Sequence, residues 1–287
     1  MACFRPLDAY QLDSGEIIFS ERGKIRRALT LPCGRCIGCR LARQRSWALR
    51  CMHEASMHEH SSFVTLTYDV PSCPISLDYR DFQRFMYRLR KQYGPTRFFV
   101  CGEYGEITRR PHFHALLFGR TWTNREPVGK DLYRSPDLER LWPHGFSSFG
   151  GVTYQSAAYV AGYALKKVSG AKAQDHYLTV DWRSGELVEL QPEFAHMSLK
   201  PGIGYTWFAK YWKEVYGPRD GCVLQGGKLI PAPTYYDRLL SQLDDDRFQE
   251  LTVERYNKSA LFADDNTPAR LAVRELHAHS ALKSRSL

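Results

Sequence analysis

The sequence lacks a hydrophobic stretch that could cross a bilayer, because its clean apolar runs, such as Ala115–Phe118, are only a few residues long. Residues Met1–Pro6 carry no apolar segment of the kind found in secretory signals. The chain also has no Gly-x-x-x-x-Gly-Lys-Ser/Thr motif, no internal repeat and no low-complexity tract. We therefore expect a soluble intracellular protein with no membrane partner and no fused P-loop helicase.

The composition supports a folded, basic protein. Hydrophobic residues make up 43% of the 287 positions and aromatic residues 13%, which supplies a core and excludes a disordered or collagen-like chain. The 40 Lys and Arg residues exceed the 31 Asp and Glu residues and give a net charge of +9. Such an excess favours an anionic partner, most commonly nucleic acid. The length predicts one large domain, or one domain with appendages.

A cluster of cysteines near the N-terminus predicts a metal site. The chain has eight cysteines and no export signal, so we expect reduced thiols or metal ligands rather than disulfides. Cys33, Cys36 and Cys39 follow a C-x2-C-x2-C spacing, and two intervening glycines allow a tight turn around a metal. A tetrahedral zinc site needs a fourth ligand. Cys3 is the first candidate, because a hairpin expected over residues 17–23 can fold the N-terminus back.

Other interpretations of this cluster stay open. Cys51 is the second candidate for the fourth ligand, and His53 is a third. An iron–sulfur cluster is less favoured, because the bacterial ferredoxin spacing requires a cysteine where this chain has Arg43. The simplest alternative is a set of reduced thiols in a basic loop. We predict a structural zinc ion.

The patterning predicts an α+β fold. Strands are expected at 63–68, 97–103 and 112–118, and helices at 40–58, 77–93 and 157–167. This order favours a split βαβ sandwich, in which an antiparallel sheet carries helices on one face. Residues 177–182 and 186–190 are candidates for the closing strand, and residues 120–150 are interpreted as an insertion. We expect three parts: an N-terminal hairpin, knuckle and basic helix (1–60), a core (61–217) and a charged extension (218–287).

The third strand contains the motif His112-Phe113-His114. Residues i and i+2 of a strand point to the same face, so the two imidazoles converge while the intervening ring enters the core. Two neutral imidazoles can hold a divalent cation together with an acidic ligand from the neighbouring strand. Glu103 ends that strand and is the first candidate, and Glu106 in the following turn is the alternative. Two unrelated surface histidines are the simplest competing explanation.

The helix at 157–167 carries a second motif. Tyr159 and Tyr163 stand four residues apart, so both phenols lie on one helical face. Paired aromatic residues at this spacing more often belong to a core. Small neighbours and the basic pair Lys166-Lys167 favour a function, because a nucleophilic phenol, with a free pKa of about 10, needs a nearby cation.

Together and in this order, the motifs resemble those of HUH endonucleases, and more closely those of rolling-circle replication initiators of small single-stranded DNA phages. These phages form the microvirus family, and the likeness is strongest to its gokushovirus branch. It rests on strand 63–68, on residues 102–105 leading into 110–119, and on the Tyr-x-x-x-Tyr-x-x-Lys of 159–166. Residues 33–40 and 200–204 are also similar to that branch, and the likeness covers roughly residues 1–217.

The resemblance implies a nick-and-join mechanism. His112, His114 and Glu103 would hold Mg²⁺ or Mn²⁺, and Tyr159 and Tyr163 would alternate in forming a 5′-phosphotyrosine link. Lys166, with Lys167 as a second candidate, would steady the phosphate or the phenolate. The partners implied are single-stranded DNA at the phage origin, a host helicase and a host DNA polymerase, in the cytoplasm of the bacterial host.

Basic side chains near these motifs are candidates for DNA contact. Arg40 and Arg43 lie on the predicted helix at 40–58, where a solvated helix face is an equally good explanation. Arg109 and Arg110 precede the histidine motif, and Lys200 opens a glycine turn that can cradle a phosphate at the start of a helix. Packing of that helix on the sheet is the alternative.

Three other functions compete with this hypothesis. A transposase or plasmid replication initiator would use the same chemistry. A non-catalytic zinc-containing DNA-binding protein would bind DNA without cutting it. A hydrolase of small phosphoesters is less favoured, because no dense Asp cluster for two metals is present.

Overall fold

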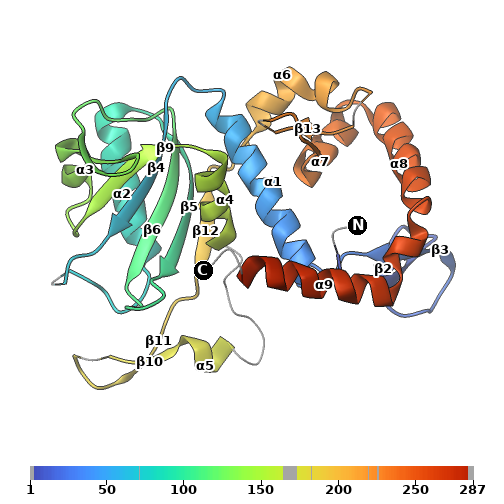
Figure 1. Cartoon of the computed structure of the whole chain (residues 1–287), viewed down its shortest axis with the longest axis horizontal. Helices are drawn as coiled ribbons and strands as arrows, with labels where there is room; N and C mark the ends of the chain where they lie inside the picture. The colour runs from blue at the N-terminus through green and yellow to red at the C-terminus, as the bar shows by residue number, and fades with distance from the viewer. Residues whose placement is uncertain are drawn as a thin grey trace. The chain divides into compact units, whose positions relative to one another are not determined.

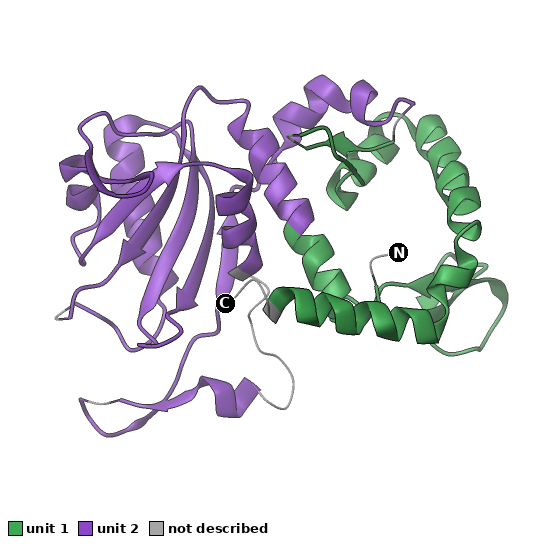
Figure 2. Cartoon of the chain, in the orientation of Figure 1, with its two compact units in different colours: residues 1–44, 220–287 green, residues 45–219 purple. Residues whose placement is uncertain are grey.

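A computed structural model describes residues 3–70, 72–163, 173–181, 183–218, 220–224 and 226–283. The chain forms two compact units, one of residues 1–44 with 220–287 and the other of residues 45–219 (Figure 2). Helix α1 (Ile37–Ala55) runs from the first unit into the second. The division into three parts expected from the sequence stays a prediction.

An antiparallel sheet of seven strands is the centre of the second unit (Figure 1). Its strand order is β12-β5-β6-β4-β9-β8-β7, and every pairing is antiparallel. The strands are β4 (Ser61–Thr67), β5 (Arg97–Tyr104), β6 (Pro111–Phe118), β7 (Glu126–Gly129), β8 (Leu132–Arg134), β9 (Ser147–Gly151) and β12 (Phe194–Met197). The predicted α+β class with an antiparallel sheet is confirmed.

Helices cover both faces of this sheet, so the expectation of helices on one face was wrong. Helices α2 (Tyr79–Tyr93) and α3 (Pro136–Leu141) pack on one face, and α4 (Tyr154–Tyr163) packs with the end of α1 on the other. The reason lies in β6, where alternate residues enter two cores. Phe113 and Leu117 join the α2 core, whereas Leu116 and Phe118 join the α4 core.

Local signals explain where α2 begins and ends. The side chain of Asp78 accepts a hydrogen bond from the backbone N–H of Arg80, which caps the first turn. Gly94 follows the last residue with a φ of 83°, a conformation that costs glycine little. Between these two residues Phe82, Phe85 and other apolar side chains form one buried stripe.

The candidates for the closing strand were also wrong. Strands β10 (Leu178–Val180) and β11 (Leu187–Glu189) pair only with each other, and the sheet is closed by β12 on β5. The apolar residues of the hairpin are largely exposed, with Leu187 at 69%, whereas Phe194 of β12 packs on the α2 core. Residues 120–150 are likewise part of the sheet, since they include β7, β8 and most of β9.

Two further helices belong to the second unit. Helix α5 (Ala173–Tyr177) precedes the β10–β11 hairpin. Helix α6 (Tyr205–Val215) follows β12, and its first turn is held by Glu54, whose Oε2 accepts from the N–H of Gly204 at 2.7 Å. The helix start that the sequence offered to a phosphate therefore already has a carboxylate, which favours the packing interpretation.

The first unit combines small sheets and helices from the two ends of the chain. Its elements are β1 (Leu7–Leu12), β2 (Ile17–Ile18), β3 (Ile25–Leu31), β13 (Cys222–Val223), β14 (Leu229–Ile230), α7 (Thr234–Leu243), α8 (Asp245–Ala260), the 3₁₀ helix η1 (Ala263–Asn266) and α9 (Pro268–Lys283). Arg5 donates to Glu275 at 2.9 Å, and Arg255 bridges Asp220 and Asp237. Within the described ranges, no helix combines the length and apolar character that a membrane span requires.

Candidate active site

Two adjacent strands bring a carboxylate and two imidazoles together. In the register of β5 and β6, Glu103 lies opposite His112, and Cys101 lies opposite His114. The Glu103 Oε1 atom is 2.6 Å from Nε2 of His112 and 3.0 Å from Nε2 of His114. One ligand atom from each side chain lies within 4.8 Å of the others. The alternation of a strand produces this arrangement, as the sequence predicted.

Outer contacts hold both imidazoles in position. The Nδ1 atom of His112 lies 3.2 Å from the carbonyl oxygen of Arg110, and Nδ1 of His114 lies 2.9 Å from the hydroxyl of Thr65. A carbonyl oxygen only accepts, so Nδ1 of His112 carries the proton and its Nε2 lone pair faces Glu103. Histidines that bind metals are held through the other ring nitrogen in the same way. Sequence reasoning missed Thr65, whose only signal was the pairing of β4 with β6.

The chemistry of these side chains fits a divalent cation. Glu103 is buried at 3% exposure, and one of its oxygens, Oε2, has no hydrogen-bond partner among the described residues. Burial raises the pKa of Glu103, but hydrogen bonds with His112 and His114 outweigh it and leave the pKa below its usual value. An ionised carboxylate beside two imidazole nitrogens is a common ligand set for divalent metals. Glu106 lies exposed in the turn and is not part of this group.

A tyrosine from α4 lies against this group. The ring of Tyr159 meets that of His114 edge-on, with centroids 5.0 Å apart, and also contacts Phe63. Tyr159 is 44% exposed, so a partner in solution can reach it. Tyr163 is the last residue of α4, and nothing is described of its side chain; Lys166 and Lys167 lie outside the described residues. The catalytic roles of all four stay predictions.

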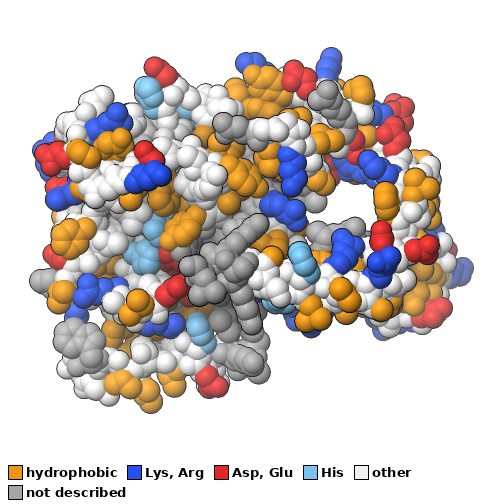
Figure 3. All heavy atoms as spheres, in the orientation of Figure 1, with side chains coloured by type: hydrophobic (Ala, Val, Ile, Leu, Met, Phe, Trp, Pro, Cys, Tyr) orange, Lys and Arg blue, Asp and Glu red, His pale blue; other side chains and the backbone are white. Residues whose placement is uncertain are grey.

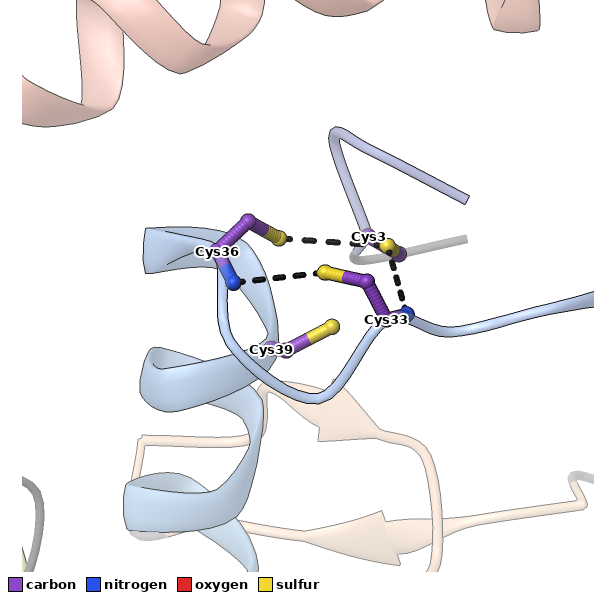
Figure 4. Close-up of side chains that lie close together, drawn as sticks. All are labelled: Cys3, Cys33, Cys36 and Cys39. Atoms are coloured by element: carbon purple, nitrogen blue, oxygen red, sulfur yellow. Dashed lines mark hydrogen bonds between the residues drawn. The ribbon is translucent and has the colours of Figure 1, made fainter. Parts of the chain in front are cut away.

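The four cysteines proposed as metal ligands lie together in the first unit (Figure 4). Their Sγ atoms are within 4.8 Å of one another, and Cys3 contributes the fourth. The N–H of Cys33 donates to Sγ of Cys3 and the N–H of Cys36 to Sγ of Cys33, both at 3.3 Å. Burial raises the pKa of Cys36, but hydrogen bonds from backbone N–H groups and neighbouring thiols lower it to about 6. Four thiols with a readily formed thiolate fit a tetrahedral zinc site.

The alternative fourth ligands have other surroundings. Cys51 is fully buried in the core beneath α4. His53 stacks on Trp207 with ring centroids 3.4 Å apart, and burial lowers the pKa of His53 to about 3. Neither residue belongs to the group of thiols.

The basic residues proposed for DNA contact are dispersed. Arg40 and Arg43 lie on α1, where Arg43 donates to the carbonyl of Gly34 at 3.3 Å, and Lys200 is exposed after β12. Arg109 and Arg110 are exposed in the turn before β6. Over the described part of the face in Figure 3, basic side chains are mixed with acidic ones rather than gathered in one block. Net charge alone therefore does not locate a nucleic-acid surface.

The fold and this site define an α+β protein with a candidate divalent-metal site next to a tyrosine on a helix. Residues 61–168, which include the strands and helix of the site, match the family model described as replication-associated protein ORF2. Replication-associated protein VP4 of Bdellovibrio phage phiMH2K is 35% identical over 254 residues, which cover 82% of this chain and 76% of that protein. The chain belongs to the family of phage replication-associated proteins.

Two further relatives agree with this assignment. Replication-associated protein ORF2 of Spiroplasma virus 4 is 29% identical over 285 residues, covering 86% of this chain and 83% of that protein. Replication-associated protein ORF4 of Chlamydia phage 1 is 34% identical over 152 residues, covering 48% of this chain and 38% of that protein. No solved structure matches the chain. The predicted resemblance to microvirus replication initiators is confirmed.

Proposed function

We propose that this protein is a metal-dependent, site-specific endonuclease and strand transferase for single-stranded DNA. It starts and ends rolling-circle replication of a small circular phage genome. The observation that carries the proposal is the convergence of Glu103, His112 and His114, with the partly exposed ring of Tyr159 packed on one of the histidines. Family membership supports the role in replication.

Each part of the site has a chemical role in this proposal. Bound to Glu103, His112 and His114, Mg²⁺ or Mn²⁺ supplies polarisation of a non-bridging oxygen of the scissile phosphate. The phenolate oxygen of a tyrosine forms a bond to phosphorus as the bond from phosphorus to the 3′ oxygen breaks. The phenol gives up its proton, and the departing 3′ oxygen takes one. The products are a 5′-phosphotyrosine and a free 3′-OH that primes synthesis.

The second tyrosine allows the cycle to close. Tyr159 and Tyr163 stand one helical turn apart in α4, so one can cut the regenerated origin while the other still carries the first strand. The released 3′-OH then attacks the phosphotyrosine, which restores the phenol and reseals the DNA without ATP. Lys166 or Lys167 would steady the phosphate or phenolate. Arg40, Arg43, Arg109, Arg110 and Lys200 would contact the DNA backbone.

Other components complete the proposed system. The thiols of Cys3, Cys33, Cys36 and Cys39 would hold a structural zinc ion, with no part in the chemistry. Because the sequence has no P-loop motif, a host helicase would unwind the duplex and a host DNA polymerase would extend the 3′-OH. These partners place the protein in the cytoplasm of the bacterial host.

The test is trapping of a covalent protein–DNA adduct. End-labelled single-stranded oligonucleotides that tile the genome encoding the chain are incubated with the protein, with and without Mn²⁺, and run on a denaturing gel. We expect one tile to give a metal-dependent adduct that the double variant Tyr159→Phe/Tyr163→Phe cannot form. Tyr87→Phe is the matched control, because that tyrosine is 69% exposed on α2, away from the site.

Two outcomes would contradict the proposal. Full nicking by the double variant would remove the tyrosines from the chemistry. Tight, metal-independent binding with no adduct on any tile would favour a zinc-containing DNA-binding protein, which would also bind DNA normally after His112→Ala. Origin joining without transposition separates the initiator from a transposase.

A further inference from the structure

A basic cavity adjoins the histidine strand. It has a volume of about 300 Å³ and lies between the loop after β4, the β5–β6 turn and the β10–β11 hairpin. Arg109, Arg110 and Arg183 line it together with apolar side chains that include Ile75, Val180 and Leu190. The cavity thus combines three positive charges with an apolar lining, and all of its walls belong to the second unit.

Hydrogen bonds hold the three walls together. The buried Tyr104 hydroxyl accepts from the N–H of Leu77 at 3.0 Å and donates to the carbonyl of Gln191 at 2.8 Å, so it joins the loop to the hairpin. The N–H of Gln191 also donates to the Ser76 hydroxyl at 2.8 Å. Arg183 donates to the carbonyl of Cys73 at 2.9 Å. The cavity is therefore built by specific contacts rather than left between loosely placed loops.

The arginines have environments that suit an anion. Arg109 has a φ of 54°, which is uncommon for a residue with a side chain and is found where a tight turn is held for a purpose. Burial raises the pKa of the Cys73 thiol, whereas the charges of Arg110 and Arg183 lower it, which places both guanidinium groups near this lining residue. Among the described residues, no hydrogen bond or ion pair engages the guanidinium of Arg110.

The cavity is coupled to the candidate metal group. The carbonyl of Arg110 holds Nδ1 of His112 at 3.2 Å, and only Pro111 separates the two residues. Two residues of extended chain span at most about 7 Å. A DNA strand whose scissile phosphate lies at His112 would therefore pass the cavity within one or two nucleotides.

We propose that this cavity binds one nucleotide of the single-stranded DNA, with its phosphate at the arginines and its base against the apolar wall, and so contributes to recognition of the origin. The volume lies at the lower end of the range for small-molecule sites, about 300–1,000 Å³, which suits a single nucleotide. Unstacked bases are commonly read in pockets formed by apolar surfaces and arginine planes. The inference rests on the proposed function, but its test does not require cutting.

The test measures binding of single-stranded DNA in the Tyr159→Phe/Tyr163→Phe background, so that no covalent capture interferes. Fluorescein-labelled tiles of the encoding genome are titrated by polarisation, and each nucleotide of the tightest tile is then replaced by an abasic site. We expect loss of one base to weaken binding about tenfold. Val180→Trp, at a position 55% exposed, fills the cavity and should remove this dependence on the base without affecting folding.

Charge variants give a second, independent readout. Arg183→Gln should reduce the slope of log affinity against log salt by about 0.7, the value for one lost phosphate contact on a single strand. Arg183→Lys should restore the slope. Lys91→Gln is the control, because this residue is exposed near the end of α2 and should change neither slope nor base preference.

The outcomes separate this inference from the proposed function. An unchanged abasic profile in Val180→Trp, or an unchanged salt slope in Arg183→Gln with the fold intact, would overturn the nucleotide site. Failure of every tile to bind would overturn it as well. The expected binding effects in a protein that forms no covalent adduct would retain the site and reject the nicking activity.

Discussion

The buried carboxylate of Glu54 should be a major determinant of the stability of the second unit. Its Oε1 accepts from Nε of Arg97 at 2.5 Å, and its Oε2 accepts from the N–H of Gly204 at 2.7 Å. The side chain of Glu54 is only 2% exposed. One carboxylate thus fixes the end of α1 to β5 and to the start of α6, on the sheet face that carries the histidines.

The cost of Glu54→Ala follows from what remains unpaired. Removing one partner of a buried ion pair costs about 3–5 kcal/mol. The side chain of Arg97 is 23% exposed and keeps a 2.8 Å bond to the carbonyl of Pro201, so water can solvate part of its charge. We therefore expect the lower end, about 3 kcal/mol. Glu54→Gln should cost less, because its amide oxygen can still accept one of these bonds.

Urea unfolding at neutral pH, followed by tryptophan fluorescence and circular dichroism, measures this effect. Glu59→Ala is the matched control, since that carboxylate has a side-chain exposure of 89% and should stay within about 0.5 kcal/mol of wild type. A loss below about 1 kcal/mol in Glu54→Ala would refute the reasoning, because a buried pair that matters cannot be removed so cheaply.

Three other predictions follow from the geometry. Cys36→Ser should abolish stoichiometric zinc, measured by metal analysis, and make the first unit sensitive to protease; a full zinc content would contradict the four-thiol site. Gly145→Ala should cost about 3 kcal/mol, because φ is +150° and a Cβ would lie 2.3 Å from a backbone nitrogen, whereas Gly151→Ala has open space and should be near neutral in the same melt. His114→Ala should lose Mn²⁺ binding in calorimetry, while Tyr159→Phe should retain it; equal binding by both would remove the imidazole from the site.

Most of the site could be predicted from the sequence because its signals are local. The strand of His112 and His114 is apolar and continuous, so alternation alone places both imidazoles on one face. The short turn from Glu103 fixes the register that brings the carboxylate beside them. Cys3 was harder to place, because its position depends on a sheet that returns the N-terminus to the knuckle.

The remaining features depend on long-range contacts. Strand β12 has four residues, too few for a clear pattern, and its place in the sheet is set by packing of Phe194. Coverage of both sheet faces did have a signal, since β5 contains the continuous apolar run 98–101, which is typical of strands buried on both sides. The cavity lined by Arg183 had none, because it forms only where three distant segments meet.

The central claim is that a tyrosine of α4 becomes covalently attached to DNA beside the metal group. The most direct test is to trap the adduct with Mn²⁺ and the reactive oligonucleotide, trim the DNA with nuclease, digest the protein and map the modified peptide by mass spectrometry. The account predicts a nucleotide linked through its 5′ phosphate to Tyr159 or Tyr163. A nucleotide on any other residue, or no modified peptide when the oligonucleotide has been cut, would contradict it.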